Sequence, residues 1–339
     1  MADGVASGPN DALIRFMVDR LSRGVVVPFL GAGVNCCGRP PQFNWRADCD
    51  YLPAGAELSL HLAAAAQYPK TSDDERKNLL RVAQYLSTKG GGGALRDELH
   101  TIFDREYHPT AVHRFFARLT GTLKTKNYPR EERDLKGFQQ LIVTTNYDDL
   151  LERAFRDEGV EFDLLIYKAM QGARGWFWHI NPKGEAVQIQ EPNKYDALSL
   201  DVRPVIVKIH GTINKGNPAD DGYVITEDDY IDYLAGADLS NFLPMVIKSE
   251  LVKSHFLFLG YSLQDWNLRV FLKRIWDEQA KFGYKSWAIQ LHVEDIDREL
   301  WRSRQVEIVE ASLEDYVQEM TEQIGALPVL PARQVGNGS

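Results

Sequence analysis

Cysteine is scarce in this sequence. Only three of its 339 residues are cysteines, namely Cys36, Cys37 and Cys49, and no two of them form a CxxC pair. An odd number of thiols does not suit a disulfide framework. Three thiols also cannot complete a tetrahedral zinc site without other ligands. We therefore expect neither disulfides nor a four-cysteine zinc site.

Long apolar runs and positive charge are also lacking. No run approaches the roughly 20 residues that a membrane-spanning helix needs. The first residues have neither the charged segment nor the apolar core of a signal peptide, so we expect a cytoplasmic protein without a membrane contact. The 39 Lys and Arg residues are outnumbered by 48 Asp and Glu residues, which gives a net charge of −9. Direct binding of nucleic acid is therefore not expected.

The most informative stretch is an apolar run from Val25 to Leu30 that ends in Gly31 and Gly33. Its lack of polar alternation is typical of a strand buried on both faces of a parallel sheet. Glycines let the backbone approach a ligand closely, and amides at such a turn can face a phosphate. Taken alone, the same pattern is equally compatible with a tight strand-to-helix turn.

Three more apolar runs are followed directly by polar residues. They lie within residues 141–149, 205–211 and 256–265. In an open α/β sheet, ligands bind beyond the carboxyl ends of the strands. The sequence thus predicts an α/β fold with a Rossmann-like, doubly wound parallel sheet, and it predicts one cleft shared by four strand ends.

The residues at these four ends carry a family resemblance. Their order and broad spacing resemble the sirtuin family, and more closely its bacterial sirtuin-like branch of NAD hydrolases. The matching motifs are Gly31-Ala32-Gly33, Thr145-Asn146-Tyr147-Asp148, His210-Gly211 and Gly260-Tyr261-Ser262. Protein-deacylating sirtuins carry a zinc ribbon built from two CxxC pairs. Because this sequence has none, the resemblance implies a member without zinc and puts deacylation in doubt.

The resemblance implies NAD as the substrate and assigns roles to three residues. Asn146 would position a water or the ribose hydroxyls, His210 would take a proton, and Asp148 would support Asn146 or the ribose. From the residues alone, Asp148 also suits a helix cap, and His210 also suits a packed strand end. The positions implied for NAD binding are Gly31, Ala32, Gly33, Asn35, Thr145, Gly260, Tyr261, Ser262 and Asp265. Asn35 stands where the family usually has serine.

The implied function is cleavage of NAD to nicotinamide and ADP-ribose, serving as an NAD-depleting effector of bacterial anti-phage defence. Such an enzyme must be inactive at rest. The resemblance therefore also implies a homo-oligomer or a regulatory partner, such as an ATPase or an Argonaute-like protein. Two alternatives stay open. One is NAD-dependent protein deacylation or ADP-ribosyl transfer, and the other is a non-catalytic sensor of NAD or ADP-ribose.

The domain organisation follows from composition and periodicity. Residues 1–49 and 136–325 are expected to form the sirtuin-like domain, with a helical insertion over 50–135 and a flexible tail over 326–339. Four consecutive glycines, Gly90 to Gly93, predict a joint within the insertion. The four histidines of the insertion show no metal-ligand spacing, so surface or capping roles are expected for them.

Smaller patterns complete the prediction. The aromatic stretch within residues 168–203 favours a hairpin on the core over an acceptor site. Thr226 with Asp229 predicts a capping box, and Ser312 is expected to cap the last helix. Lys208 is expected to point away from His210.

Overall fold

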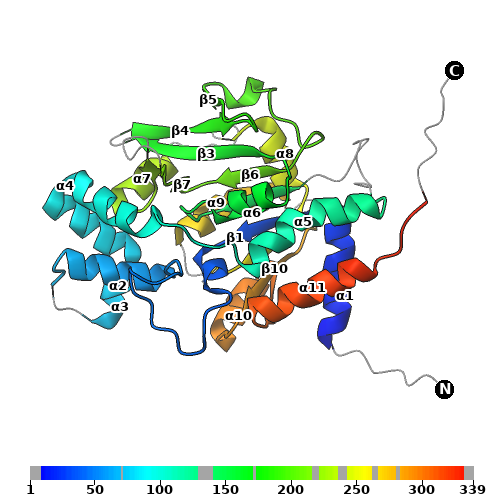
Figure 1. Ribbon diagram of the computed structural model, residues 1–339, viewed down its shortest axis with the longest axis horizontal. Coiled ribbons are helices and arrows are strands. Elements are labelled where there is room, and N and C mark those ends of the chain that lie inside the picture. The colour runs from blue at the N-terminus through cyan, green and yellow to red at the C-terminus, as the bar shows by residue number, and fades with distance from the viewer. Residues whose placement is uncertain are drawn as a thin grey trace.

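The computed structural model describes residues 9–69, 72–128, 140–170, 173–215, 221–235, 243–261, 266–279 and 283–331. Within these ranges the chain is built on a nine-stranded sheet, in the order β11-β10-β9-β1-β2-β6-β3-β4-β5 (Figure 1). The strands from β11 to β3 are parallel, and β4 and β5 are antiparallel additions. The strands are β1 (Val26–Leu30), β2 (Leu141–Thr144), β3 (Asp163–Met170), β4 (Ala173–Ile180), β5 (Ala186–Gln188), β6 (Val205–Lys208), β9 (His255–Leu259), β10 (Ser286–Gln290) and β11 (Val306–Glu310).

The connectivity reverses beside β1. From β1 the chain moves to one side through β2, β3 and β6, and it then returns to the other side of β1 with β9, β10 and β11. This reversal is a topological switch point, the place where open α/β sheets bind ligands. The prediction of a doubly wound, Rossmann-like sheet is confirmed.

Two layers of helices cover the sheet, because the unbroken apolar strands expose hydrophobic side chains on both faces. Helices on one face share a core cluster with the sheet, and helices on the other face share a second cluster. The first face carries α1 (Pro9–Ser22), α5 (Ala111–Thr125), α6 (Leu150–Asp157) and α11 (Leu313–Ala326), and the second carries α7 (Glu227–Ala235), α8 (Met245–Val252), α9 (Trp266–Gln279) and α10 (Asp295–Arg302).

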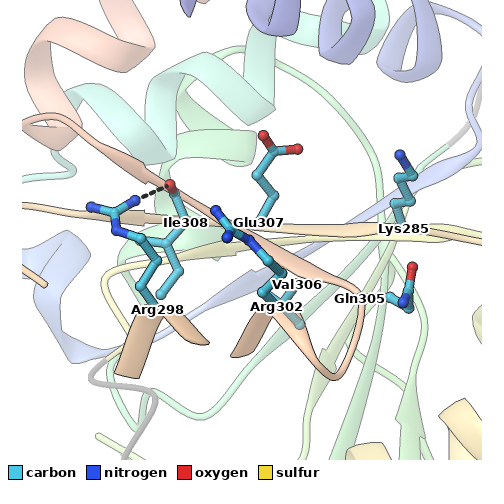
Figure 2. Close-up of a pocket in the computed structure, with 7 residues that line it drawn as sticks. All are labelled: Lys285, Arg298, Arg302, Gln305, Val306, Glu307 and Ile308. Carbon is cyan, nitrogen blue, oxygen red and sulfur yellow. Dashed lines mark hydrogen bonds between the residues drawn. The ribbon is translucent and has the colours of Figure 1, made fainter. Parts of the chain in front are cut away.

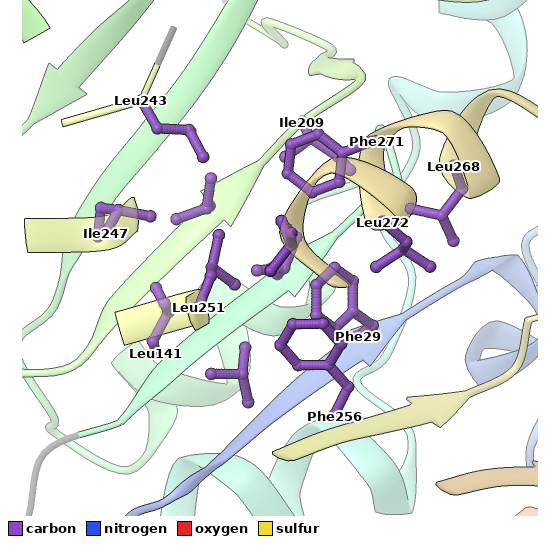
Figure 3. Packing of buried hydrophobic residues seen from close by; sticks show 14 of the residues in the cluster. Phe29, Leu141, Ile209, Leu243, Ile247, Leu251, Phe256, Leu268, Phe271 and Leu272 are labelled. Atoms are coloured by element: carbon purple, nitrogen blue, oxygen red, sulfur yellow. The ribbon is translucent and has the colours of Figure 1, made fainter. Parts of the chain in front are cut away.

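The packing on the second face is dominated by large side chains (Figure 3). The rings of Phe29 on β1 and Phe256 on β9 lie 5.0 Å apart. Phe271 and Leu272 of α9 belong to the same buried cluster. Full burial of such a side chain contributes about 1.5–3 kcal/mol. This packing therefore holds β1 and β9, whose ends carry the glycine motifs, in a fixed register.

A third cluster lies at the carboxyl edge of the sheet. It consists mainly of α2 (Gly55–Ala65) and α4 (Leu79–Phe103), with α3 (Asp73–Arg76) joining them. Tyr147 and Ile213, which follow β2 and β6, are buried in it. The helical insertion is therefore packed against the segments that carry the predicted site.

The predicted joint in the insertion is a kink at one residue. Gly91 has φ 76° and ψ 162° within α4, and this conformation interrupts the helix. α5 falls within the predicted insertion, yet it packs on the sheet layer with α6 and α11. The boundaries 50–135 stay a prediction, and the helices that share the third core are α2 and α4.

Several local predictions are confirmed. β4 pairs antiparallel with β3 and β5, as the hairpin prediction required. Thr226 and Asp229 form the reciprocal capping box, with bonds of 3.1 and 2.9 Å. Ser312 caps α11. His113 in the insertion has the predicted capping role, because its ring accepts a hydrogen bond from the Thr110 amide at 3.0 Å. It is not a surface residue, since its side chain is buried.

The start of the predicted tail is anchored. The Lys126 ammonium donates to the carbonyls of Gly325 and Leu327, at 2.7 Å each. The Leu330 amide donates to the Lys126 carbonyl. Residues 332–339 lie outside the described ranges. In the part of the chain that is described, no helix is both long and apolar enough to cross a bilayer.

Candidate active site

Four strand ends meet at one edge of the sheet. Leu30 on β1 is in register with Leu259 on β9 and with Thr144 on β2, and Thr144 is in register with Lys208 on β6. The predicted motifs begin one residue after Leu30, Thr144 and Leu259 and two residues after Lys208. The parallel sheet therefore brings the four motifs to a single edge, as predicted.

The glycine turns after β1 and β9 contact each other. The Gly31 amide donates to the Leu259 carbonyl and the Gly33 amide donates to the Gly260 carbonyl, both at 2.9 Å. A Cβ on Gly31 would lie 2.6 Å from the Gly260 oxygen, closer than any tolerated contact. The glycines are therefore required first for the packing of the two turns. A phosphate at this turn would have to be held by donors other than these two amides.

Asn146 has a buried acceptor atom without a partner. Its side-chain amide nitrogen donates to the Gly31 carbonyl at 3.3 Å, and its backbone amide donates to the Thr144 hydroxyl at 3.0 Å. That hydroxyl donates in turn to the Leu30 carbonyl at 2.9 Å. The Oδ1 atom of Asn146 is buried and has no hydrogen-bond partner among the described residues. Because burying an unpaired carbonyl is costly, this atom suits a hydroxyl donor from a ligand.

Asp148 supports Asn35 and the start of α6. One carboxylate oxygen accepts from the Leu150 amide at 3.1 Å, at the start of α6, although the N-cap residue of this helix is Asp149. The other accepts from the Asn35 side-chain nitrogen at 2.8 Å. The Asp148 carboxylate is thus bonded to Asn35 and not to Asn146, and its predicted support of the ribose stays a prediction. The Oδ1 atom of Asn35 is also buried and has no hydrogen-bond partner in the described ranges.

His210 lies on the second face of the sheet. Its Nδ1 atom is 3.2 Å from the Tyr230 hydroxyl, and its ring meets those of Tyr230 and Tyr233 edge-on. Gly211 follows with φ +86°, and a Cβ there would lie 1.6 Å from the Gly222 oxygen, so only glycine fits. The tight pairing of β7 (Gly211–Thr212) with β8 (Gly222–Tyr223) therefore fixes the chain directly after His210.

Lys208 points to the opposite face, as predicted. In a regular strand, side chains at positions i and i+2 point to the same face. Here β6 ends at Lys208 and the chain turns before His210, so the two side chains point to opposite faces. The Lys208 side chain is completely buried and pairs with Glu152 on α6 at 2.9 Å. This pair and the Tyr230 contact are two features that the sequence-based reasoning missed. A charged residue inside an apolar run was the available signal for the first.

The remaining predicted binding residues have different outcomes. Ala32 and Thr145 are half-buried at the edge. The Tyr261 ring packs in the core near Phe258, with ring centroids 6.3 Å apart, so the side chain of Tyr261 serves packing. Ser262 and Asp265 lie outside the described residues. Their roles, like the other assigned roles in NAD binding, stay predictions.

A separate hollow of about 340 Å³ lies at the amino ends of β10 and β11, opposite the candidate site (Figure 2). Arg298 donates across it to the Ile308 carbonyl at 3.2 Å, and its other nitrogen pairs with Glu310. None of its seven lining residues has a buried side-chain nitrogen or oxygen without a partner. This hollow therefore lacks the feature that marks the carboxyl edge.

The described residues include no group of three or more His, Cys, Asp or Glu side chains that could hold a metal ion. The expectation that the protein needs no zinc stays a prediction. Burial raises the pKa of the Cys36 and Cys37 thiols, which lie just after Asn35. Both thiols are therefore protonated near neutral pH and are poor nucleophiles.

Several known proteins are similar in sequence to this chain. The NAD(+) hydrolase ThsA of Cytobacillus dafuensis is 24% identical over 266 residues, covering 78% of this chain and 41% of that protein. ThsA of Acinetobacter baumannii (strain 532279) is 26% identical over 270 residues, covering 77% and 42%. Defense-associated sirtuin 2 of Bacillus subtilis is 23% identical over 287 residues, covering 84% and 23%. The chain thus spans less than half the length of these relatives.

A solved structure from work on the mechanism and regulation of Sir2 enzymes aligns with a TM-score of 0.43 and 12% identity, covering 92% of this chain and 96% of that one. A family model described as a SIR2-like domain matches residues 140–309, about half of the chain. The matched segment contains Asn146, Asp148, His210 and Gly260. The chain belongs to the SIR2-like family.

Proposed function

We propose that this protein is an NAD hydrolase that cleaves NAD to nicotinamide and ADP-ribose. The observation that carries the proposal is the buried, unpaired Oδ1 atom of Asn146, at the edge where four strand ends meet. Its side-chain nitrogen is committed to Gly31, which aims the oxygen away from the turn. A ribose hydroxyl or a water supplies the donor that this oxygen lacks.

The chemistry requires few groups. The bond between nicotinamide and C1 of the ribose breaks, and its electron pair leaves with neutral nicotinamide. The ribose passes through an oxocarbenium-like state, and the oxygen of water then bonds to C1. Asn146 orients the reacting hydroxyl or water, and His210 takes the proton that water loses. Asp148 acts through Asn35, which it holds at 2.8 Å.

Membership of the SIR2-like family supports this reading, and so do the printed names of the ThsA relatives, which are NAD(+) hydrolases. The name of Defense-associated sirtuin 2 supports a role in anti-phage defence. We extend the proposal to a cytoplasmic NAD-depleting effector that is kept inactive at rest. Its control would come from homo-oligomerisation or from a regulatory partner such as an ATPase or an Argonaute-like protein.

Product analysis tests the proposal. Purified protein is incubated with NAD and the products are separated by chromatography, beside Asn146→Ala and His210→Ala. We expect nicotinamide and ADP-ribose from the parent protein and neither product from the two variants. Formation of O-acyl-ADP-ribose from an acylated peptide would instead identify a deacylase. If NAD binds saturably without turnover, candidate partners are added next. Turnover that then begins would identify an enzyme that needs its partner, and binding that stays without turnover would identify a sensor.

A further inference from the structure

A buried ion pair lies directly beneath the segment that carries Asn146. The Lys208 side chain is 0% exposed and the Glu152 side chain is 3% exposed, with 2.9 Å between Nζ and Oε1. Lys208 is the last residue of β6, and Glu152 lies in the first turn of α6. The same ammonium group donates a second hydrogen bond to the backbone carbonyl of Asp148. Lysine is almost never fully buried unless it is paired.

Folding stability does not explain this pair. Removing two charges from water costs several kcal/mol per ion, and replacing such a pair with apolar side chains of similar volume is often neutral or stabilising. The surroundings would accept such a replacement, because Ile206 on β6 and Leu151 on α6 are buried in the apolar cluster of this face. The pair also leaves the Oε2 atom of Glu152 buried without a hydrogen-bond partner in the described ranges.

The second bond of Lys208 indicates what the pair does. Asp148 lies near the end of the short segment between β2 and α6, and Asn146 lies two residues earlier in the same segment. The carboxylate of Asp148 holds Asn35 and the Leu150 amide. Fixing the Asp148 backbone therefore fixes both of the unpaired amide oxygens at this edge, those of Asn146 and Asn35.

We propose that Lys208 and Glu152 are a positioning pair, which holds the segment 146–148 so that the Asn146 and Asn35 side chains keep the geometry required for cleavage. Neither residue touches the substrate, and each acts through Asp148. The effect on cleavage rests on the proposed NAD hydrolase function, whereas the effect on the segment does not.

His113 on α5 is the nearby titratable group that faces this pair from another helix. Burial lowers the pKa of His113 to about 4, so its ring is neutral at pH 7. The ring is fixed as a cap, since its Nδ1 atom accepts from the Thr110 amide. His113 therefore adds no positive charge beside Lys208 at neutral pH.

The test separates stability from positioning. Lys208→Met alone leaves the Glu152 carboxylate buried without its cation, so this variant is expected to be unstable. Lys208→Met combined with Glu152→Leu removes both charges and keeps the volume, so its thermal unfolding should match the parent. Its kcat for NAD cleavage should still fall, by about 10- to 100-fold, because small misplacements of a site are costly. KM should change much less.

A matched control uses the same side-chain types elsewhere. Lys248 on α8 and Glu278 on α9 form an ion pair of 3.0 Å on the other face of the sheet. Lys248→Met combined with Glu278→Leu should leave kcat unchanged. Glu152→Gln keeps an acceptor for Lys208, and it should retain more activity than the double variant at the paired site.

Hydrogen–deuterium exchange supplies a readout that needs no activity. The amides of residues 145–150 should exchange faster in the Lys208→Met/Glu152→Leu protein than in the parent, and the control should match the parent. A double variant with parental stability, kcat and exchange would overturn the inference. If the parent cleaves no NAD even with candidate partners added, the proposed function fails, and the exchange result alone decides whether the pair holds the segment.

Discussion

Two buried polar clusters lie at opposite edges of the same sheet, and they differ in how completely they are paired. At the amino end of β3, His179 is bonded through one ring nitrogen to Asp163 at 3.0 Å and through the other to the Tyr195 hydroxyl at 2.6 Å. The second oxygen of Asp163 forms an ion pair with Arg203 Nε at 3.3 Å, and this nitrogen is the one buried atom of the cluster without a hydrogen-bond partner among the described residues. Burial and the Asp163 carboxylate raise the pKa of Tyr195, so the phenol keeps its proton beside His179.

The cluster at the carboxyl edge is left incomplete. The side-chain oxygens of Asn35, Asn146 and Glu152 are buried and have no hydrogen-bond partner among the described residues. A paired cluster contributes to folding, whereas an unpaired one costs free energy. With three unpaired oxygens at the carboxyl edge and one unpaired nitrogen at the amino edge, we expect the amino-edge cluster to be structural and the carboxyl edge to bind the ligand.

The largest effect should come from Asn146→Ala. Without its acceptor, NAD cleavage should fall by roughly 10²- to 10⁴-fold, the range typical of positioned catalytic groups. The free energy of unfolding should change by only about 1 kcal/mol, because the lost oxygen has no partner and the lost nitrogen makes a single long bond, of 3.3 Å, to the Gly31 carbonyl. Steady-state kinetics and urea unfolding measure the two effects. A strongly destabilised but active variant would reverse the assignment of the carboxyl edge.

At the amino edge the opposite pattern is expected. His179→Ala leaves the Asp163 carboxylate buried without its imidazole, so the protein should lose about 3 kcal/mol of stability. The folded fraction should cleave NAD with the parental kcat. Denaturant unfolding and kinetics at low temperature check this. Loss of activity in a variant that is still folded would show that the two clusters are not functionally distinct.

His113 should make the carboxyl edge sensitive to acid. Its pKa is about 4 in the folded protein and 6.5 ordinarily, with burial as the main cause. The unfolded chain therefore takes up a proton first as the pH falls. This contribution to stability is complete above pH 6.5 and is lost progressively down to pH 4, by about 3 kcal/mol in total.

His113→Gln is the matched variant, because glutamine keeps an acceptor for the Thr110 amide but does not titrate. Urea unfolding of both proteins between pH 7 and pH 4 should show a steeper loss in the parent. Parallel curves would mean that His113 does not contribute to acid sensitivity.

The smallest effect is expected from Thr144→Val, at a paired group within the carboxyl edge. The Thr144 hydroxyl links the Leu30 carbonyl to the Asn146 amide. Its loss should cost about 1 kcal/mol of stability and lower kcat far less than Asn146→Ala does. Equal losses of kcat in the two variants would show that backbone position, and not the amide oxygen, is what matters.

Much of the fold could be predicted because the strands are unbroken apolar runs. The runs before Gly31, Asn146, His210 and Gly260 all became parallel strands with their ends at one edge. That arrangement follows from topology alone, since parallel strands share a direction. The sequence did not show that α5 packs on the sheet and not with the insertion. The apolar face of an amphipathic helix predicts burial, but it does not specify which apolar surface the helix packs against.

The details of the site depended on contacts between distant residues. The pairing of Asp148 with Asn35 joins positions 113 residues apart, and that of Lys208 with Glu152 joins positions 56 apart. Neither pair has a local pattern. From the sequence, the amides of Gly31 and Gly33 were candidates to bind a phosphate. In the structure they instead donate hydrogen bonds to the carbonyls of Leu259 and Gly260, at the end of β9. The missing information was therefore which polar groups satisfy one another in three dimensions.

The most direct measurement is a crystal structure of the His210→Ala protein with NAD. The proposed function places the nicotinamide ribose at the unpaired oxygen of Asn146. We predict NAD at the carboxyl edge, with a ribose hydroxyl or a water about 3 Å from Asn146 Oδ1. NAD bound elsewhere, for example in the basic hollow beside Arg298 and Arg302, with Asn146 Oδ1 still without a donor, would contradict it.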